Sequence, residues 1–198
     1  MKKKIILSMF TLFIIVGCAS LRPTKIIPAI DQGATIFPKT GAVVSTKSGL
    51  VVLAVPLNDV KEVDAFGVII VNETSNWVSF YKNKCVLLDP NGSTFNPLSK
   101  SEEHFHIGRN FKPKMPPEFK MELFAWRHGI IGRGSIPGMP LEDLQKTLVM
   151  PGSKRQFFLY FKKRSIESSR LTLIIPNVYN EVSDEKTTFA FKFDVQKG

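Results

Sequence analysis

The most regular pattern of apolar and polar positions lies close to the carboxyl end of the chain. Between residues 187 and 195, every second position is large and apolar: Phe189, Phe191, Phe193 and Val195. Successive side chains of a β-strand point to opposite faces, so this spacing predicts a strand with one buried face. The residues that alternate with them are small or charged and are expected on the opposite face.

Shorter runs of β-branched and aromatic residues recur through the rest of the chain, each bounded by Gly, Pro, Asn or Asp. They predict strands at 50–57, 65–71, 77–81, 84–88, 93–98, 156–161 and 170–175. Between two of these runs, Asp89-Pro90-Asn91-Gly92 predicts a tight turn. One stretch, 140–148, carries leucines at helical spacing and predicts a short helix. Strands without a strand–helix rhythm favour an all-β antiparallel sandwich over an α/β enzyme fold.

The amino terminus has the organisation of a secretory signal peptide. Three lysines at 2–4 precede an apolar run over residues 5–17. As a helix, this run would span about 20 Å, which is short of the roughly 30 Å hydrocarbon core of a bilayer. We therefore expect residues 1–17 to be a cleaved signal peptide. The alternative is an uncleaved anchor that reaches Leu21 and is flanked by Arg22.

The end of this run, Ile15-Val16-Gly17-Cys18, resembles the lipobox of bacterial lipoproteins: a branched apolar residue stands three positions before the cysteine and a small residue directly before it. The resemblance implies that Cys18 is diacylglycerated, that the chain is cut before it, and that the new amino group is acylated, for example with palmitate. Two or three acyl chains would give lasting attachment to a membrane. Ala19 stands where an Asp would favour the inner membrane, so the resemblance implies the outer membrane, facing the periplasm or the cell surface.

Residues 18–47 contain several Pro and Gly and scattered Lys, which is typical of a linker. We interpret them as a lipidated amino terminus and flexible tether that precedes one folded domain over residues 48–198. The short apolar pieces at 26–27 and 43–44 leave open the alternative that this segment adds an edge strand. About 150 residues suffice for one domain core but not for two.

Several segments of the domain are similar to the immunoglobulin-like domains of exported bacterial lipoproteins. The run Phe66-Gly-Val-Ile-Ile-Val-Asn72-Glu-Thr is a strand that ends in Asn, and Val86-Leu-Leu-Asp89-Pro-Asn-Gly92-Ser-Thr-Phe95 matches their hairpin pattern. Val78-Ser-Phe80 lies between them, and Met150-Pro151-Gly152-Ser153 precedes an apolar strand at 157–161, as in that family. The resemblance implies an immunoglobulin-like β-sandwich. Its motifs are structural, so it implies a fold and no activity.

The chain is basic, with 27 Lys and Arg against 17 Asp and Glu. Without the three lysines of the signal peptide, 24 basic residues remain against the same 17 acidic ones, a net charge of +7. In a cytosolic protein this charge would indicate nucleic-acid binding, but the predicted export argues against that partner. If Cys18 carries lipid, Cys85 is alone and no intrachain disulfide can form. We expect Cys85 to be a small buried residue in a strand rather than a reactive thiol.

An insertion in the sandwich is predicted at about 99–147, because this segment is too long for a hairpin loop. Long loops on a rigid sandwich often carry binding sites. Basic residues alternate here with aromatic ones, a combination that suits anionic phospholipid headgroups, lipopolysaccharide phosphates, glycans or an acidic protein. The candidate binding surface consists of His104, His106, Arg109, Lys112, Lys114, Trp126, Arg127, His128 and Arg133. The alternative is that residues 119–126 form another core strand and that the charges lie on its solvated face.

The histidines are the best candidates for metal ligands, and they are weak ones. His104 and His106 are two positions apart, so both side chains would leave the same face of an extended strand. Glu102, Glu103 and His128 could supply further ligands. Neither a cysteine cluster nor a His-Glu-x-x-His motif accompanies them, so we expect no metal and no cofactor.

Catalytic motifs are similarly weak. The loop 132–138 contains Ser135 but lacks the glycines at 133 and 137 that a nucleophile elbow requires. We therefore predict that the protein is not an enzyme but a non-catalytic binding or scaffolding module of the bacterial envelope, whose partner is another envelope protein. The alternatives are a binder of phospholipid or lipopolysaccharide, and a His-dependent metal-binding protein or enzyme.

Overall fold

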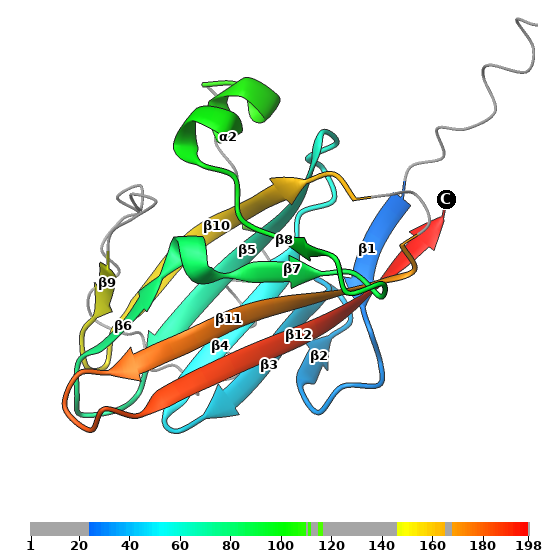
Figure 1. The fold of residues 1–198 in the computed structure, drawn as a ribbon. Helices are drawn as coiled ribbons and strands as arrows, with labels where there is room; N and C mark the ends of the chain where they lie inside the picture. Colours follow the sequence, from blue (N-terminus) through cyan, green and yellow to red (C-terminus); the bar gives the residue numbers. More distant parts are fainter. Residues whose placement is uncertain (1–23, 110, 112–114, 117–145, 165–167, 198) are drawn as a thin grey trace, which may run out of the picture.

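Two antiparallel sheets pack face to face in the described part of the chain (Figure 1). The computed structural model describes residues 24–109, 111, 115–116, 146–164 and 168–197. The predicted all-β class, with two antiparallel sheets in a sandwich, is confirmed. The predicted signal peptide over 1–17 and the lipidated Cys18 lie outside the described residues.

The larger sheet has seven strands. They are β1 (Thr24–Pro28), β6 (Val78–Tyr81), β7 (Val86–Leu88), β8 (Thr94–Phe95), β9 (Lys146–Val149), β11 (Arg170–Asn180) and β12 (Lys186–Lys197). The strand order is β1-β12-β11-β6-β9, while β7 pairs with both β11 and β8. The predicted strands at 170–175 and 187–195 therefore form neighbours at the centre of this sheet.

The smaller sheet has five strands. They are β2 (Thr35–Phe37), β3 (Ala42–Lys47), β4 (Leu50–Pro56), β5 (Val63–Asn72) and β10 (Lys154–Lys162). The strand order is β10-β5-β4-β3-β2. Strand β5 pairs along its length with β10 on one side and β4 on the other, so the predicted strands at 50–57, 65–71 and 156–161 lie next to one another.

Phenylalanines fill much of the space between the sheets. Phe189, Phe191 and Phe193 of β12 are fully buried, as the alternation predicted, whereas Val195 is only partly buried. The ring of Phe193 lies 5.1 Å from the ring of Phe66 on β5 in the opposite sheet. Each such side chain contributes about 2–3 kcal/mol when it is fully buried. A shift of β12 by one residue would expose all three, which fixes its register.

Strands β4 and β5 of the smaller sheet are buried on both faces. Every residue of β4 and β5 is buried, and the side chains that point away from the larger sheet form a second apolar cluster. Met115 lies against Gly67 of β5, where an added Cβ would stand only 2.6 Å from Met115 Cε. A larger residue at position 67 would force the end of the Met115 side chain to move. By contrast, β12 exposes Thr188, Ala190 and Lys192 on its outer side, so the larger sheet presents a solvated face.

The folded domain begins earlier than predicted. The tether expected over 18–47 is wrong for residues 24–47, which form β1, β2 and β3. Strand β1 pairs with β12 and β3 pairs with β4, and Ile26 and Val43 are buried between the sheets. The alternative of an added edge strand therefore holds. The glycines and prolines punctuate short strands; Gly41, for example, has a φ of 71° in the turn between β2 and β3.

The position of the helix also differs from the prediction. Helix α2 (Lys100–Ile107) lies inside the predicted insertion, and a 3-10 turn, η1 (Lys82–Lys84), joins β6 to β7. The helix predicted over 140–148 is wrong at its carboxyl end, because Lys146–Val149 is strand β9 and pairs with β6. Its residues 140–145 lie outside the described part. Over the residues that the structure covers, no helix has the length and apolar character needed to span a membrane.

The tight turn predicted at residues 89–92 is confirmed. The carboxylate of Asp89 accepts hydrogen bonds from the N–H groups of Asn91 and Ser93, both at 2.9 Å. Gly92 adopts a φ of 83°, a left-handed conformation that favours glycine. The strand predicted after this turn at 93–98 is shorter than expected, because β8 contains only Thr94 and Phe95.

Candidate functional site

Three members of the predicted binding surface lie in the described part of the chain: His104, His106 and Arg109. The other members, Lys112, Lys114, Trp126, Arg127, His128 and Arg133, lie outside it. His104 and His106 are on α2, not on an extended strand. Two positions on an α-helix differ by about 200° around its axis, so their side chains leave nearly opposite sides. The expectation that they share a face is therefore wrong.

The two carboxylates considered as further metal ligands are engaged elsewhere. Glu102 closes a capping box: the N–H of Ser99 donates to its carboxylate at 2.9 Å, and the Ser99 hydroxyl accepts from its N–H. These hydrogen bonds hold the pKa of Glu102 below its usual value. Glu103 forms an ion pair with Lys82 at 2.7 Å. Within the residues that the structure describes, no three or more His, Cys, Asp or Glu side chains are grouped so that they could hold a metal ion.

Helix α2 stands on the surface of the sandwich. None of its residues is buried, and Phe105 is 85% exposed, with its ring edge-on to His106 at 5.2 Å. The capping box, the Lys82–Glu103 pair and the contact of Ile107 with the second apolar cluster hold the helix in place. The described part of the predicted surface thus mixes aromatic and basic groups, and its described residues do not form a set of metal ligands.

A second group of exposed apolar side chains lies on the outer face of the larger sheet, where β6 meets β9. In the register of these strands, Ser79 stands opposite Leu148, and Tyr81 stands opposite Lys146, so the four side chains share one face. Residues 77 and 150 directly precede β6 and follow β9. The β6–β9 patch consists of Trp77, Tyr81, Leu148 and Met150, which are 44, 40, 50 and 39% exposed.

A polar network joins the β6–β9 patch to the end of β11. The Ser79 hydroxyl donates to the carboxylate of Glu181, and Lys146 Nζ pairs with the same carboxylate at 2.8 Å. Lys146 Nζ also lies 5.6 Å from the centre of the Tyr179 ring. The hydrogen bonds from Lys146 and then Ser79 lower the pKa of Glu181. A carboxylate with a lowered pKa is a poor general base, so the network holds the strands together rather than activating Ser79.

The predicted strand at 77–81 carries half of this patch, but the patch itself is not among the predicted sites. The alternation of Trp77, Ser79 and Tyr81 was visible in the predicted strand at 77–81. The partner strand β9 overlaps the end of the helix predicted over 140–148, and that prediction does not bring Leu148 and Met150 beside β6. Buried and exposed positions alternate over 146–149 in the structure, but polar and apolar residues do not alternate there in the sequence, so this strand has no local signal.

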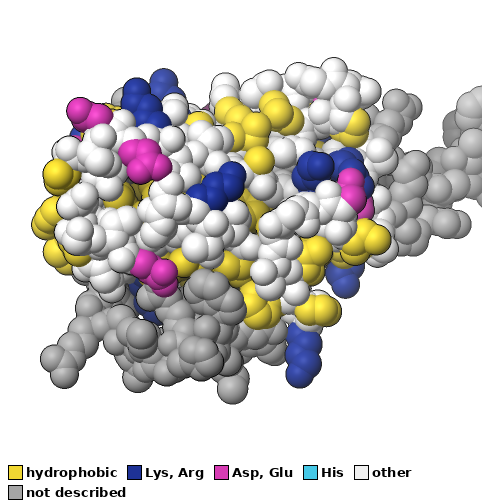
Figure 2. Space-filling model, turned by 90° about the horizontal axis from the view of Figure 1, so that it is seen from below, with side chains coloured by type: hydrophobic (Ala, Val, Ile, Leu, Met, Phe, Trp, Pro, Cys, Tyr) yellow, Lys and Arg dark blue, Asp and Glu magenta, His cyan; other side chains and the backbone are white. Residues whose placement is uncertain are grey.

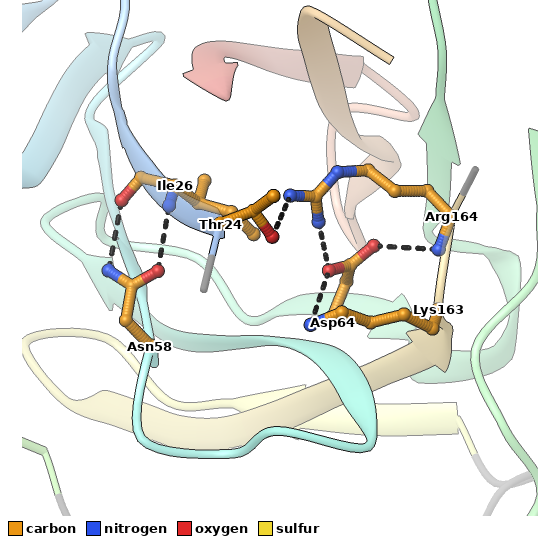
Figure 3. Close-up of polar contacts among 6 residues, drawn as sticks. All are labelled: Thr24, Ile26, Asn58, Asp64, Lys163 and Arg164. Atoms are coloured by element: carbon orange, nitrogen blue, oxygen red, sulfur yellow. Dashed lines mark hydrogen bonds and ion pairs between the residues drawn. The ribbon is translucent and has the colours of Figure 1, made fainter. Parts of the chain in front are cut away.

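The amino-terminal strand is fastened to the smaller sheet by polar contacts (Figure 3). Arg164 Nη1 forms an ion pair with the carboxylate of Asp64, and the backbone N–H of Arg164 donates a hydrogen bond to the same carboxylate at 3.2 Å. Its Nη2 donates to the Thr24 hydroxyl at 3.1 Å, while Lys163 Nζ lies 3.7 Å from Asp64. The side chains of Asp64 and Arg164 are 0 and 3% exposed, so the pair is shielded from water. These four residues are termed the clasp.

Asn58, in the loop between β4 and β5, occupies the free edge of β1. Its side chain accepts a hydrogen bond from the N–H of Ile26 at 2.7 Å and donates one to the carbonyl of Ile26 at 2.9 Å. Because β1 pairs with β12 along its other edge, Asn58 protects an edge that could otherwise accept a foreign strand. Thr24 pairs with Lys197, so both ends of the described chain lie at one end of the sandwich (Figure 1).

Lys and Arg side chains are dispersed over the face that Figure 2 shows from below. They lie in separate positions among hydrophobic, acidic and other groups. The positive charge of the chain is therefore not gathered into one patch on this face.

Cys85 is buried, as predicted, but it lies at the junction of η1 and β7 rather than in a strand. Burial raises the pKa of its thiol to about 12. The thiol is therefore protonated at neutral pH and is a poor nucleophile.

Comparison with known proteins gives few matches. No family model matches the sequence, and no curated protein matches it. Among solved structures, the chain is similar to the YjhA protein of Bacillus subtilis, with 12% sequence identity over 87% of this chain and 92% of that chain, and a TM-score of 0.35.

Proposed function

We propose that the protein is a lipoprotein anchored to a bacterial membrane, with the outer membrane favoured, through lipid on Cys18. Its folded part acts as a non-catalytic binding or scaffolding module for another envelope protein. The lipobox resemblance supports the anchor, and the β6–β9 patch is the observation that carries the binding role. The partner-binding surface includes this patch.

The residue types of the patch suit a protein partner. Trp, Tyr and Met are enriched at protein interfaces, where a few large side chains supply most of the binding energy. Each member is 39 to 50% exposed, so each retains apolar surface that a partner could bury. The Lys146–Glu181 pair beside them supplies a polar rim whose geometry is already fixed.

We also propose that the sandwich is immunoglobulin-like. Strands β4, β5 and β10 are neighbours in one sheet, in the order expected for strands A, B and E. In the other sheet, β6 and β7 both pair with β11, which pairs with β12, as strands C, F and G do. The buried tryptophan and disulfide of antibody domains have no counterpart in the described residues, where Trp77 is half-exposed and Cys85 is a free thiol.

A crosslinking experiment tests the proposed function. The lipidated protein would be crosslinked in its native envelope, captured and analysed by mass spectrometry, with a Cys18→Ala variant to test the anchor. The double variant Trp77→Ser/Leu148→Ser removes the centre of the patch, and Ile30→Ser, which changes a side chain that is 90% exposed elsewhere, is the matched control.

We expect one stoichiometric partner that is retained by Ile30→Ser and reduced at least about 10-fold by the patch variant, as for loss of interface hot spots. Equal capture by all variants would place the partner elsewhere on the protein and refute the patch. Capture of no protein by the anchored wild type would refute the binding role.

A further inference from the structure

The proposed anchor lies very close to the folded domain. Six residue steps separate Cys18 from Thr24, and a fully extended chain spans at most about 3.6 Å per step, or about 22 Å in total. Strand β12 is 12 residues long, which corresponds to about 40 Å. A lipid on Cys18 would therefore hold the Thr24 end of the sandwich near the headgroups, while the opposite end could stand well away from them.

The clasp and Asn58 make this end rigid. Thr24 accepts a hydrogen bond from Arg164, and both backbone groups of Ile26 are bonded to Asn58 (Figure 3). These hydrogen bonds keep β1 in the sandwich, and the residues between Cys18 and Thr24 are long enough for the lipid to reach the membrane without detachment of the strand. The same contacts bring the end of β10 and the loop between β4 and β5 next to the start of β1.

Exposed lysines from three segments surround this point. They are Lys25 of β1, Lys61 of the β4–β5 loop, and Lys162 and Lys163 at the end of β10. The exposed acidic residues of the same segments are Asp59 and Glu62, while Asp64 is buried and paired with Arg164. Helix α2 adds Lys100 and, near Lys162, Glu102, which carry opposite charges, so five exposed lysines stand against three exposed carboxylates at the end that the tether would hold against the membrane.

The opposite end of the sandwich has a smaller excess of positive charge. Around its turns, the basic residues are Lys47, Lys146, Lys154, Arg155 and Lys186, and the acidic residues are Glu73, Glu181, Asp184 and Glu185. The larger excess at the Thr24 end, together with the short tether, points to an anionic surface as the partner of that end.

We propose that Lys25, Lys61, Lys162 and Lys163 rest on the anionic phospholipid headgroups of the membrane that holds the lipid anchor. The inference depends on the proposed lipidation of Cys18, and it assigns one orientation to the anchored domain. Each lysine close to an anionic surface strengthens binding by about fivefold, and the effect decays within a Debye length of about 8–10 Å. A tether of at most about 22 Å allows the lysines to come within this distance of the headgroups, where their attraction to the anionic surface can hold them.

Lysine footprinting of the lipidated protein tests the orientation. The protein would be reconstituted in vesicles of phosphatidylcholine with 30% phosphatidylglycerol or of phosphatidylcholine alone, and lysine acetylation by a water-soluble reagent would be followed by mass spectrometry. We expect the four lysines to react at least severalfold more slowly on the anionic vesicles. Lys154 and Lys186 should react at the same rate on both, and 0.5 M salt should abolish the protection.

A pair of variants makes the test specific. Lys162→Gln/Lys163→Gln should reduce the remaining protection of Lys25 and Lys61 severalfold, whereas Lys154→Gln/Lys186→Gln should leave it unchanged. Protection that is absent on anionic vesicles while the protein stays lipid-anchored, or that is unaffected by the first variant, would overturn the headgroup contact alone. A mature chain without lipid on Cys18, measured by intact mass, would overturn the proposed anchor and this inference with it.

Discussion

Replacing Arg164 by methionine would leave the buried carboxylate of Asp64 without its main partner. The side chains of Asp64 and Arg164 are 0 and 3% exposed, so water cannot take over the role of either group. Removal of one partner from a buried ion pair destabilises a protein by about 3–5 kcal/mol. Lys163 lies 3.7 Å from Asp64 and can compensate in part, so we expect the lower end of this range, about 3 kcal/mol.

A second substitution distinguishes the free-energy cost of the unpaired Asp64 charge from the cost of the lost hydrogen bonds. In Arg164→Met/Asp64→Asn, the charge that Arg164→Met leaves unpaired is removed while the shape of the side chain is kept. The remaining loss should be that of one or two hydrogen bonds, about 1 kcal/mol. The double variant should therefore be more stable than Arg164→Met alone by about 2 kcal/mol.

Urea and thermal unfolding, followed by circular dichroism, measure these losses. For a domain of this size, 3 kcal/mol corresponds to a fall in Tm of about 6–12 °C. Arg170→Met is the matched control, because Arg170 pairs with Asp31 and Asp194 at 2.7 and 2.8 Å but is exposed to water. It should change the Tm very little. Similar small losses for both arginine variants, or a double variant as unstable as Arg164→Met, would refute the reasoning.

Three further predictions concern other parts of the fold. Gly67→Val should destabilise the protein by about 1–3 kcal/mol in thermal unfolding, because its side chain would collide with Met115; Met115→Ala should restore part of the loss, and failure to do so would contradict the contact. Helix α2 should fray in acid: the pKa of Glu102 is lowered in the folded state, so its contribution is present above the ordinary value of 4.5 and is lost as the pH falls through the folded pKa. Hydrogen exchange of α2 measures this fraying, and a pH dependence that persists in Ser99→Ala would count against the capping box as its cause. Cys85 should resist thiol reagents at pH 8 in the native protein, because burial raises its pKa to about 12; rapid labelling without unfolding would disprove its burial.

The strands were predictable wherever burial imposes a simple pattern. In β12, one face meets the core and the other meets solvent, so the phenylalanines alternate with small or charged residues. In β4 and β5 both faces are buried, so the sequence shows continuous apolar runs bounded by turn residues. Each pattern follows from local contacts of the strand with water or with the core. The sequence alone is sufficient to recognise it.

The helix and β9 could not be recognised by apolar periodicity. Helix α2 buries none of its residues, so it has no apolar stripe. The signal that remained was the sequence Ser99-Lys100-Ser101-Glu102, which has the spacing of a capping box and forms one in the structure. Strand β9 carries only two buried positions, Thr147 and Val149, and its Leu148 completes a helical spacing by chance.

The candidate sites depend on contacts between residues that are far apart in the chain. Asp64 and Arg164 are 100 residues apart, and Val78 of β6 pairs with Val149 of β9. No local pattern encodes such partners, so neither the clasp nor the β6–β9 patch could be predicted from one sequence. The prediction of a binding surface at 99–147 rests on composition, and composition does not specify which side chains the fold brings together.

The β6–β9 patch and the proposed anchor lie at opposite ends of one rigid sheet. The patch lies at the Lys186 end of β12, because Ser79 pairs with Tyr179 and Tyr179 pairs with Lys186. The anchor lies at the other end of the same strand, because Thr24 pairs with Lys197. The 11 residue steps between Lys186 and Lys197 correspond to about 36 Å. If both proposals hold, the sandwich itself keeps the patch away from the membrane, and the short tether serves to orient it.

Insertion of ten Gly and Ser residues directly before Thr24 separates the membrane contact of the lysines from the binding of a protein partner by the patch. A longer flexible tether lowers the effective concentration of the lysine-bearing end at the membrane, so the footprint of Lys25, Lys61, Lys162 and Lys163 should weaken severalfold. Capture of a protein partner through Trp77 and Leu148 should be unchanged, because the patch and its supporting strands are not altered. Loss of partner capture with an intact lysine footprint would show that the two surfaces have been assigned the wrong way round.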